Sequence, residues 1–193
     1  IHWIKLVGIS GGLSMENAGK RDDIDLIIIT SKNRLWITRL LALFILEIIG
    51  QRRKVDHSIK QAAGKICLNI LIEEDRLEQT RKNLYTAHEV LQMKPLWFRD
   101  GIYSKYLEDN SWAFKFLPNW ISELRVKSKE LRIKKNNSES NFLEKLAKKF
   151  QLRIMKKPQG MERIEDGALY FHPKDWGKEI MEKYKLKIAT LDK

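Results

Sequence analysis

The sequence predicts an α/β fold, a mixed sheet layered with helices, followed by a helical C-terminal module. Three segments in the first third of the chain support this prediction. Residues 24–30 are almost entirely apolar, as expected of a strand that is buried on both faces. Residues 34–49 are apolar on almost every side and too long for a strand, which indicates a buried helix that ends at Gly50. Residues 65–72 form another run typical of a strand, so strand, helix and strand follow one another.

The remaining elements follow in order along the chain. Residues 3–9 are rich in β-branched and aromatic side chains and end at Ser10-Gly11-Gly12, which predicts a first strand and a turn. Beyond residue 75 the apolar spacing becomes helical, with one helix broken before Pro95 and two short aromatic helices around Pro118. Two further helical stripes complete the pattern, at residues 142–150 and 176–184.

The composition is that of a folded, basic chain. Its 193 residues are 43% hydrophobic and 32% charged, which excludes collagen-like and low-complexity sequences. The net charge of +12 favours polyanionic partners such as nucleic acid or nucleotides. One cysteine cannot form an internal disulfide, and no apolar stretch approaches the ~20 residues of a membrane span, so we expect a cytoplasmic protein without a membrane partner. The chain begins in an apolar run, and we expect its true start to lie upstream. We expect a domain at residues 1–94 and a basic helical module at residues 95–193.

The strongest functional pattern lies between the first two predicted strands, in the stretch SGGLSMENAGKRDDIDLIII. Asp23 and Asp25 project from the same side of the second strand, because side chains alternate along a strand. Two carboxylates held together repel one another unless a cation lies between them, and oxygen ligands of this kind suit Mg²⁺. Gly11 and Gly12 allow backbone N–H groups to approach a phosphate closely. A Gly pair is also common in ordinary turns, but an unpaired carboxylate inside an apolar strand is costly, which favours a functional role for the aspartates.

This stretch resembles the signature of the DNA polymerase β-like nucleotidyltransferase superfamily: an apolar or small residue, Gly, then Gly or Ser, a spacer of similar length, and Asp-apolar-Asp-apolar. The resemblance covers residues 6–30. Three further stretches, NRLWITR, NLYTAHEVLQMKPL and ALYFHPKDW, are similar to uncharacterised bacterial proteins with a nucleotidyltransferase domain. The resemblance implies a nucleotidyltransferase fold in which Gly11 and Gly12 contact a nucleoside triphosphate (NTP), while Asp23 and Asp25 hold Mg²⁺ or Mn²⁺.

The superfamily usually supplies a third acidic residue from a neighbouring strand. The corresponding place in residues 65–72 holds Asn69, whose amide offers an oxygen to a metal but cannot accept a proton. Glu73 and Glu74 follow this strand and are alternatives, and a hydrogen-bonding role within the sheet explains Asn69 equally well. The departure bears on catalysis and not on nucleotide or metal binding.

Four further residues are candidates for contacts with a phosphate. Lys20 lies in the spacer, and the hydroxyl groups of Ser10 and Ser14 can donate to phosphate oxygens, although a solvated loop and ordinary turns explain these residues equally well. Arg39 lies in an otherwise apolar helix, where a charge requires a partner such as a carboxylate or a bound phosphate. Cys67 has no evident His or Asp partner, and we expect a buried thiol rather than a nucleophile.

The basic residues are concentrated at residues 125–157, where 12 Lys and Arg accompany 3 Asp and Glu. Such a segment is either a solvated face or a surface that binds a polyanion such as RNA. We therefore expect a Mg²⁺-dependent nucleotidyltransferase that transfers a nucleoside monophosphate from NTP to an acceptor and releases pyrophosphate, with Asp23, Asp25 and Asn69 as catalytic residues. The alternative is a catalytically impaired relative that binds nucleotide or nucleic acid, such as an antitoxin-type partner protein, and Asn69 favours this alternative.

Overall fold

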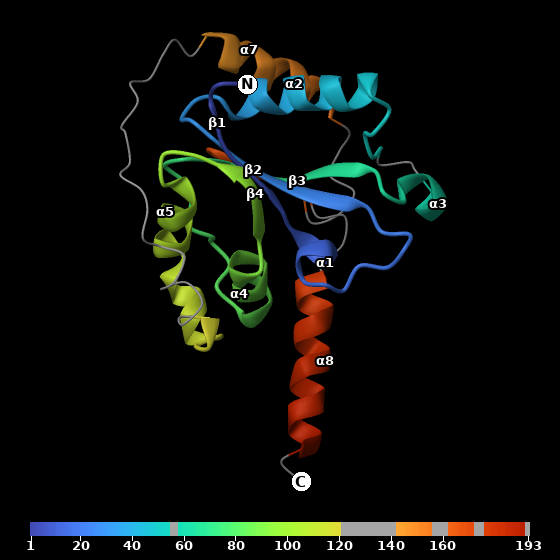
Figure 1. The fold of residues 1–193 in the computed structure, drawn as a ribbon, viewed down its shortest axis with the longest axis vertical. Coiled ribbons are helices and arrows are strands. Elements are labelled where there is room, and N and C mark those ends of the chain that lie inside the picture. Colours follow the sequence, from blue (N-terminus) through green and yellow to red (C-terminus); the bar gives the residue numbers. More distant parts are fainter. Residues whose placement is uncertain (55–57, 121–141, 156–161, 172–175, 192–193) are drawn as a thin grey trace.

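The computed structural model describes the chain except residues 55–57, 121–141, 156–161, 172–175 and 192–193 (Figure 1). Six strands form one open sheet in the order β4-β1-β2-β3-β6-β5. Strands β2 and β3 are parallel and the other neighbouring pairs are antiparallel, so the predicted α/β fold with a mixed sheet is confirmed. The strands span Ile4–Ile9 (β1), Ile24–Thr30 (β2), Ile66–Glu73 (β3), Lys94–Phe98 (β4), Arg163–Glu165 (β5) and Ala168–Tyr170 (β6).

Helix α2 (Leu35–Ile48) connects the parallel strands β2 and β3, as the apolar pattern predicts. Such a crossover is required because the chain must return to the same end of the sheet before it can form a parallel strand. The single-turn helix α3 (Ile59–Ala62) follows before β3 begins. Ile27 and Ile29 of β2 face one core and Ile28 faces the other, which explains why the whole strand is apolar.

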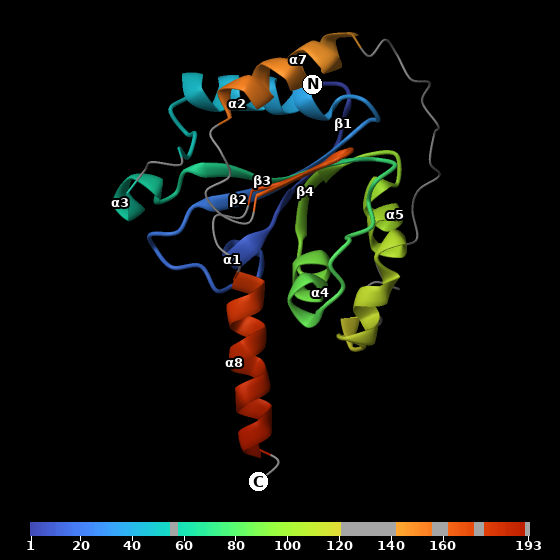
Figure 2. The ribbon, with the colours of Figure 1, turned by 180° about the vertical axis from the view of Figure 1, so that it is seen from behind.

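Helices cover both faces of the sheet (Figures 1 and 2). Helices α2 and α7 (Phe142–Ile154) lie side by side on one face, which we call the α2/α7 face, and their core includes Leu35, Leu68 and Leu169. The opposite side, the α4/α5 face, is covered by α4 (Leu84–Leu91), α5 (Ile102–Asp109) and the 3-10 helix η1 (Ser111–Lys115).

The sheet takes strands from both sides of residue 94. Strands β5 and β6, and β4 except for its first residue, belong to the half of the chain that we expected to be helical, and β4 lies at one edge of the sheet. Pro95, which we expected only to end a helix, lies within β4. A proline is tolerated there because β4 is an edge strand, and one side of an edge strand needs no N–H group for pairing. That residues 1–94 form a domain of their own stays a prediction.

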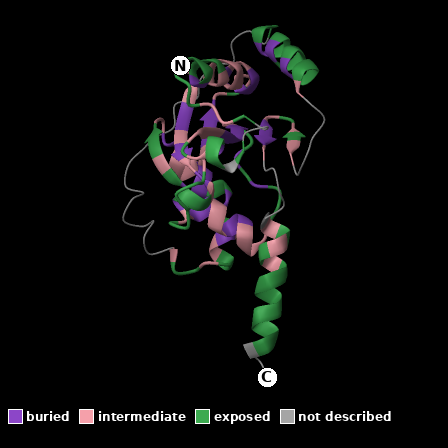
Figure 3. Cartoon of the chain, turned by 90° about the vertical axis from the view of Figure 1, so that its right-hand side faces the viewer, coloured by how far each residue is buried: buried purple, intermediate pink, exposed green. Residues whose placement is uncertain are grey.

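The last helix, α8 (Trp176–Leu191), projects from the rest of the molecule and contacts it through α4 (Figure 1). Most of α8 is exposed, and so is much of α7 (Figure 3). Among the helices of the described residues, none combines the length and the apolar character needed to cross a bilayer.

Candidate functional site

The two aspartates of the sequence motif lie at the start of β2, on the α4/α5 face of the sheet. Asp25 lies opposite Cys67 in the parallel β2–β3 ladder, on the side from which Ile27 enters the α4/α5 core. Asp23 precedes it by two residues. One ligand atom from each of Asp23, Asp25 and Cys67 lies within 4.8 Å of the other two, which is close enough for a shared metal ion. The structure thus brings the two carboxylates together.

Helix α1 (Gly11–Ser14) places the backbone directly against these carboxylates. Gly11 has a φ of +63°, and a Cβ atom at this position would lie 2.3 Å from Oδ2 of Asp25. Both the backbone conformation and the lack of space require glycine here. The N–H of Ser10 donates to the backbone carbonyl of Asp25 over 2.9 Å and fixes the turn against β2. No side chain separates the Gly11 backbone from the Asp25 carboxylate.

The other residues of this turn differ in what they contact. A Cβ atom on Gly12 would meet its nearest neighbour, the carbonyl oxygen of Asn17, at an ordinary 3.7 Å, so this position accepts a side chain. Ser14 is buried and donates its hydroxyl to the carbonyl of Gly11 over 2.9 Å, which gives it a role within the turn. Ser10 is 2% exposed, and its hydroxyl has no hydrogen-bond partner among the described residues. A buried hydroxyl without a partner is unfavourable, and a ligand at this turn would supply one.

Among the described residues, the charge of the aspartates is only partly balanced. Nε of Arg53 lies 2.7 Å from Oδ2 of Asp23, although without the alignment of a good hydrogen bond. Burial and the negative charge of Asp23 raise the pKa of Asp25 from 3.8 to about 7, against the opposing effect of Arg53. Burial and the charge of Asp25 raise the pKa of the Cys67 thiol to about 12, so Cys67 is neutral at physiological pH. A cation between the two aspartates would favour the charged form of both.

The ladder between β2 and β3 places Cys67, rather than Asn69, directly opposite Asp25. A bulge follows this pair, where the partner of Leu26 is Leu68 and the partner of Ile27 is Ile70. Asn69 is buried two residues further along, where the ladder is irregular. Glu73 and Glu74 lie at and just past the far end of β3, about 20 Å from Cys67 at ~3.3 Å per residue, so they do not reach the aspartates.

Arg39 lies on the other face of the sheet. Its Nη1 donates to Oε1 of Gln151 over 2.6 Å, and its guanidinium lies 4.5 Å from the ring centroid of Phe171. Gln151 belongs to α7, and Phe171 packs against the core of the α2/α7 face. Burial lowers the pKa of Arg39 to about 10. The Arg39 charge therefore has an amide and an aromatic ring of the same chain as its partners. The structure does not bring Arg39 together with the aspartates.

Two residues near the aspartates, Arg53 and Glu89, lie outside the sequence motif. Arg53 follows α2, and its N–H donates to the carbonyl of Ile66 over 3.0 Å, which holds its side chain next to Asp23. Glu89 of α4 is half-buried; burial raises its pKa to about 7, and the charge of Asp25 adds to this shift. Glu89 is an acidic residue in the mostly apolar pattern of α4, and this could have identified it as a candidate. No comparable feature of the sequence identifies Arg53. Lys20, which the motif does mark, is exposed in the loop between α1 and β2.

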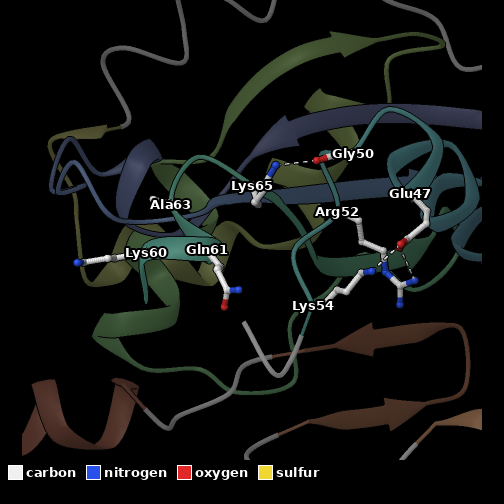
Figure 4. A pocket seen from close by; sticks show the side chains of 8 residues that line it. All are labelled: Glu47, Gly50, Arg52, Lys54, Lys60, Gln61, Ala63 and Lys65. Atoms are coloured by element: carbon white, nitrogen blue, oxygen red, sulfur yellow. Dashed lines mark hydrogen bonds and ion pairs between the residues drawn. The ribbon is translucent and has the colours of Figure 1, made fainter. Parts of the chain in front are cut away.

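Basic residues gather in two places. Of the predicted polyanion surface, residues 125–141 and 156–157 lie outside the described residues, and α7 carries the exposed cations Lys145, Lys148, Lys149 and Arg153. A second group lines a cavity of about 440 Å³ at the end of α2 (Figure 4). There Glu47 pairs with Arg52 and Lys54, and Lys65 donates to the carbonyl of Gly50 over 2.7 Å. These contacts at the carboxyl end of a helix explain Arg52, Lys54 and Lys65 as local stabilisation.

Comparisons with known proteins add little to this geometry. No protein-family model and no curated protein matches the chain. Among solved structures, the chain is similar to a crystal structure of the toxin-antitoxin with AMP-PNP, with 14% identity and a TM-score of 0.28 over 66% of this chain and 82% of that one. A likeness this weak says nothing about function.

These residues fit a hard divalent cation through their oxygen atoms. Asp23 and Asp25 offer carboxylate ligands, which suit Mg²⁺ or Mn²⁺. Cys67 is a neutral thiol and a poor ligand for either ion. The space that a Cβ atom on Gly11 would fill, and the unpaired hydroxyl of Ser10, lie at the same turn. The arrangement suits a cation that carries a phosphate group rather than a structural metal held by protein atoms alone.

Proposed function

We propose that this protein is a Mg²⁺- or Mn²⁺-dependent nucleotidyltransferase of the DNA polymerase β-like superfamily, which transfers a nucleoside monophosphate from NTP to an acceptor and releases pyrophosphate. One observation carries the proposal: the Gly11 backbone lies so close to Asp25 that a Cβ atom would be 2.3 Å from its carboxylate. Asp23 lies within the same group of ligand atoms. A metal-bound triphosphate needs an open backbone turn and paired carboxylates at one place, and this site offers both.

Each residue has a distinct task in this proposal. Asp23 and Asp25 hold the cation, which neutralises phosphate charge and polarises the phosphoryl group when it is bound. Gly11 and Gly12 present backbone N–H groups that have no acceptor within the helical turn. Ser10 donates its buried hydroxyl to a phosphate oxygen, and thereby gains the partner that the described part of the chain does not provide.

Calorimetric titration of the protein with NTP and Mg²⁺ tests the site. We expect the double variant Asp23→Asn with Asp25→Asn to lose measurable binding, because it removes both anionic cation ligands. Asp22→Asn is the matched control: Asp22 is exposed and accepts the N–H of Gly19 over 2.8 Å, a hydrogen bond that the amide can replace. If the double variant bound NTP as tightly as the parent, the aspartates would not be the metal site.

A second function, nucleotide binding without transfer, is favoured by the residue beside Asp25. That residue is the neutral thiol of Cys67, so β3 supplies no third carboxylate at this point. A protein with two carboxylates can hold a metal-bound nucleotide yet lack the group that accepts a proton from the attacking hydroxyl. Such a protein would act as a nucleotide-binding module or as the partner of another protein, and an antitoxin-type role belongs to this class.

Incubation with each labelled NTP, Mg²⁺ or Mn²⁺, and candidate acceptors, including RNA ends, separates the two functions. Label transfer that disappears in the double aspartate variant identifies a transferase, whereas NTP binding without transfer identifies the binding module. Cys67→Asp sharpens the test, because it places a third carboxylate opposite Asp25, and we expect it to raise transfer at least about tenfold. Cys67→Ser is its control. Asn69→Asp is the parallel variant at the position that the resemblance indicates, and a gain in transfer there would identify Asn69 as the third position of the site.

A further inference from the structure

Helix α7 buries polar residues and exposes its large apolar residues, which is the reverse of an ordinary amphipathic helix. Its buried residues are Glu144, Ala147 and Gln151, of which two are polar. Its large apolar side chains are exposed instead, to between 53% and 71% for the most exposed of them. A helix on the surface of a soluble domain normally buries its apolar stripe and exposes its polar face. The exposed apolar residues are Phe142, Leu143, Leu146, Phe150, Leu152 and Ile154.

Buried hydrogen bonds fix this orientation. The carboxylate of Glu144 accepts the N–H groups of Trp36 and Ile37 over 2.7 and 3.0 Å. These amides lie in the first turn of α2, where N–H groups have no acceptor within the helix, and a negative charge is favourable. Gln151 donates to the carbonyl of Trp36 over 2.7 Å and accepts from Arg39. Turning the apolar stripe of α7 inward would leave these buried groups without partners, so the stripe stays exposed.

The neighbouring helix α2 also exposes apolar residues, in its carboxyl-terminal half and just beyond. Helices α2 and α7 lie side by side on the same face of the sheet (Figures 1 and 2). At roughly half exposure each, the apolar residues of both helices present on the order of 800 Å², which is about one side of a standard protein–protein interface. Exposed apolar surface of this size marks an interaction site. The contributing residues of α2 are Phe44, Ile45, Ile48 and Ile49.

The charges on α7 decide which kind of partner fits. Lys145, Lys148, Lys149 and Arg153 are exposed, whereas the one acidic residue of the helix, Glu144, is buried against α2. A second copy of the chain would bring like charges together, which is unfavourable across an interface. A nucleic acid would match the lysines but leave the exposed phenylalanine, leucine and isoleucine side chains unexplained. A partner that is both acidic and apolar satisfies both properties of the surface.

We propose that α7, together with the carboxyl-terminal half of α2, is the docking surface for another protein that presents an amphipathic helix whose apolar stripe is flanked by Asp and Glu. The apolar stripe of that helix packs against Leu146 and Phe150, and its carboxylates pair with Lys149 and Arg153. The surface lies on the α2/α7 face, and the aspartates lie on the opposite face, so the docking surface and the nucleotide site do not overlap.

A synthetic helix tests the proposal on the full chain by fluorescence anisotropy. The probe is a labelled peptide of about five turns, with Leu at positions i, i+3, i+4 and i+7 and Glu at the flanking positions. A matched peptide carries Lys in place of each Glu. We expect the acidic peptide to bind at least about tenfold more tightly than the basic peptide, and its affinity to fall as salt is raised.

Substitutions on the surface assign the binding to α7. Leu146→Glu with Phe150→Glu should weaken binding of the acidic peptide at least about tenfold, while Leu186→Glu on α8, at a side chain that is 69% exposed, should not change it. Lys149→Glu with Arg153→Glu should reverse the preference in favour of the basic peptide. All these positions are exposed, so circular dichroism should show folded variants.

Four results would overturn the proposal. The first is equal binding of both peptides, and the second is binding of the acidic peptide that survives Leu146→Glu with Phe150→Glu. The third is a dimer by light scattering that Phe150→Glu dissociates, because a second copy would then cover the surface. The fourth is binding of RNA or of phosphatidylglycerol-containing vesicles that depends on Phe150, without binding of the acidic peptide.

Discussion

The aspartate site and the α7 surface lie on opposite faces of one sheet and differ in what holds them in place. At the aspartate site, backbone lies directly against Asp25, and only glycine fits at residue 11. On the other face, α7 is held to α2 by side chains that come from distant parts of the chain, such as Trp36 and Glu144, which are 108 positions apart. The first region is defined by local strand and turn geometry, and the second by long-range polar contacts. The two regions should therefore respond differently to substitution.

Gly11→Ala should have the largest effect, because it disrupts the contact between the Gly11 backbone and Asp25 that defines the first region. The new Cβ atom would meet the Asp25 carboxylate, and alanine is strained at a φ of +63°. We expect a loss of about 2 to 4 kcal/mol in the free energy of unfolding and loss of NTP binding. Urea denaturation and calorimetric titration measure the two effects. A variant as stable as the parent would show that the turn has room that the structure does not indicate.

Glu144→Ala should have the next largest effect and should act on the second region alone. It leaves the buried N–H group of Trp36 and the half-buried N–H group of Ile37 without acceptors, which we expect to lower the free energy of unfolding by about 1 to 3 kcal/mol. Glu144→Gln keeps one acceptor oxygen and should lose less. NTP binding should be unchanged in both variants, and a parallel loss of NTP binding would mean that the two faces are coupled.

The sequence predicts the aspartate site better than the α7 surface, because the first depends on local geometry and the second on contacts between distant residues. Residues 24–30 and the Gly and Asp spacing are patterns over a few residues, and alternation along a strand is enough to place both carboxylates on one side. The partner of Arg39 could not be predicted, because Gln151 lies 112 positions away. Strands β5 and β6 have three residues each, too few to show a period of two.

The third position of the site depends on the register between β2 and β3, which the sequence does not show. Asn69 and Cys67 both lie on β3, and the resemblance to the superfamily indicates Asn69 as the third residue. The ladder places Cys67 directly opposite Asp25, and a bulge follows at Asn69. A bulge has no mark in this sequence, since no glycine or proline occurs in residues 66–73.

Asp25→Asn should act in the opposite direction, as a stabilisation that depends on pH. The pKa of Asp25 is raised to about 7 in the folded protein, above its value of 3.8 when unfolded, so folding is penalised as pH rises from about 4 to 7. Removing the charge should stabilise the metal-free protein by roughly 1 to 3 kcal/mol at pH 8 and have little effect at pH 4. The pKa of Glu89 is raised in the same direction, so part of the pH dependence should persist in the variant. Thermal unfolding at both pH values provides the measurement, and stabilisation that is equal at pH 4 and pH 8 would contradict the assignment.

Gly12→Ala should have the smallest effect on stability and tests whether the first region is confined to one residue. Gly12 neighbours Gly11 in the same turn, but a Cβ atom on it would have no neighbour closer than 3.7 Å, and its backbone is not left-handed. Alanine loses less conformational entropy than glycine on folding, so we expect the free energy of unfolding to stay within about 0.5 kcal/mol of the parent or to rise slightly. If NTP binding then falls while stability does not, the Gly12 position is needed for the close approach of a phosphate rather than for the fold. If stability instead falls as far as in Gly11→Ala, the whole turn is sterically constrained, and the contact between Gly11 and Asp25 is not the special feature of this site.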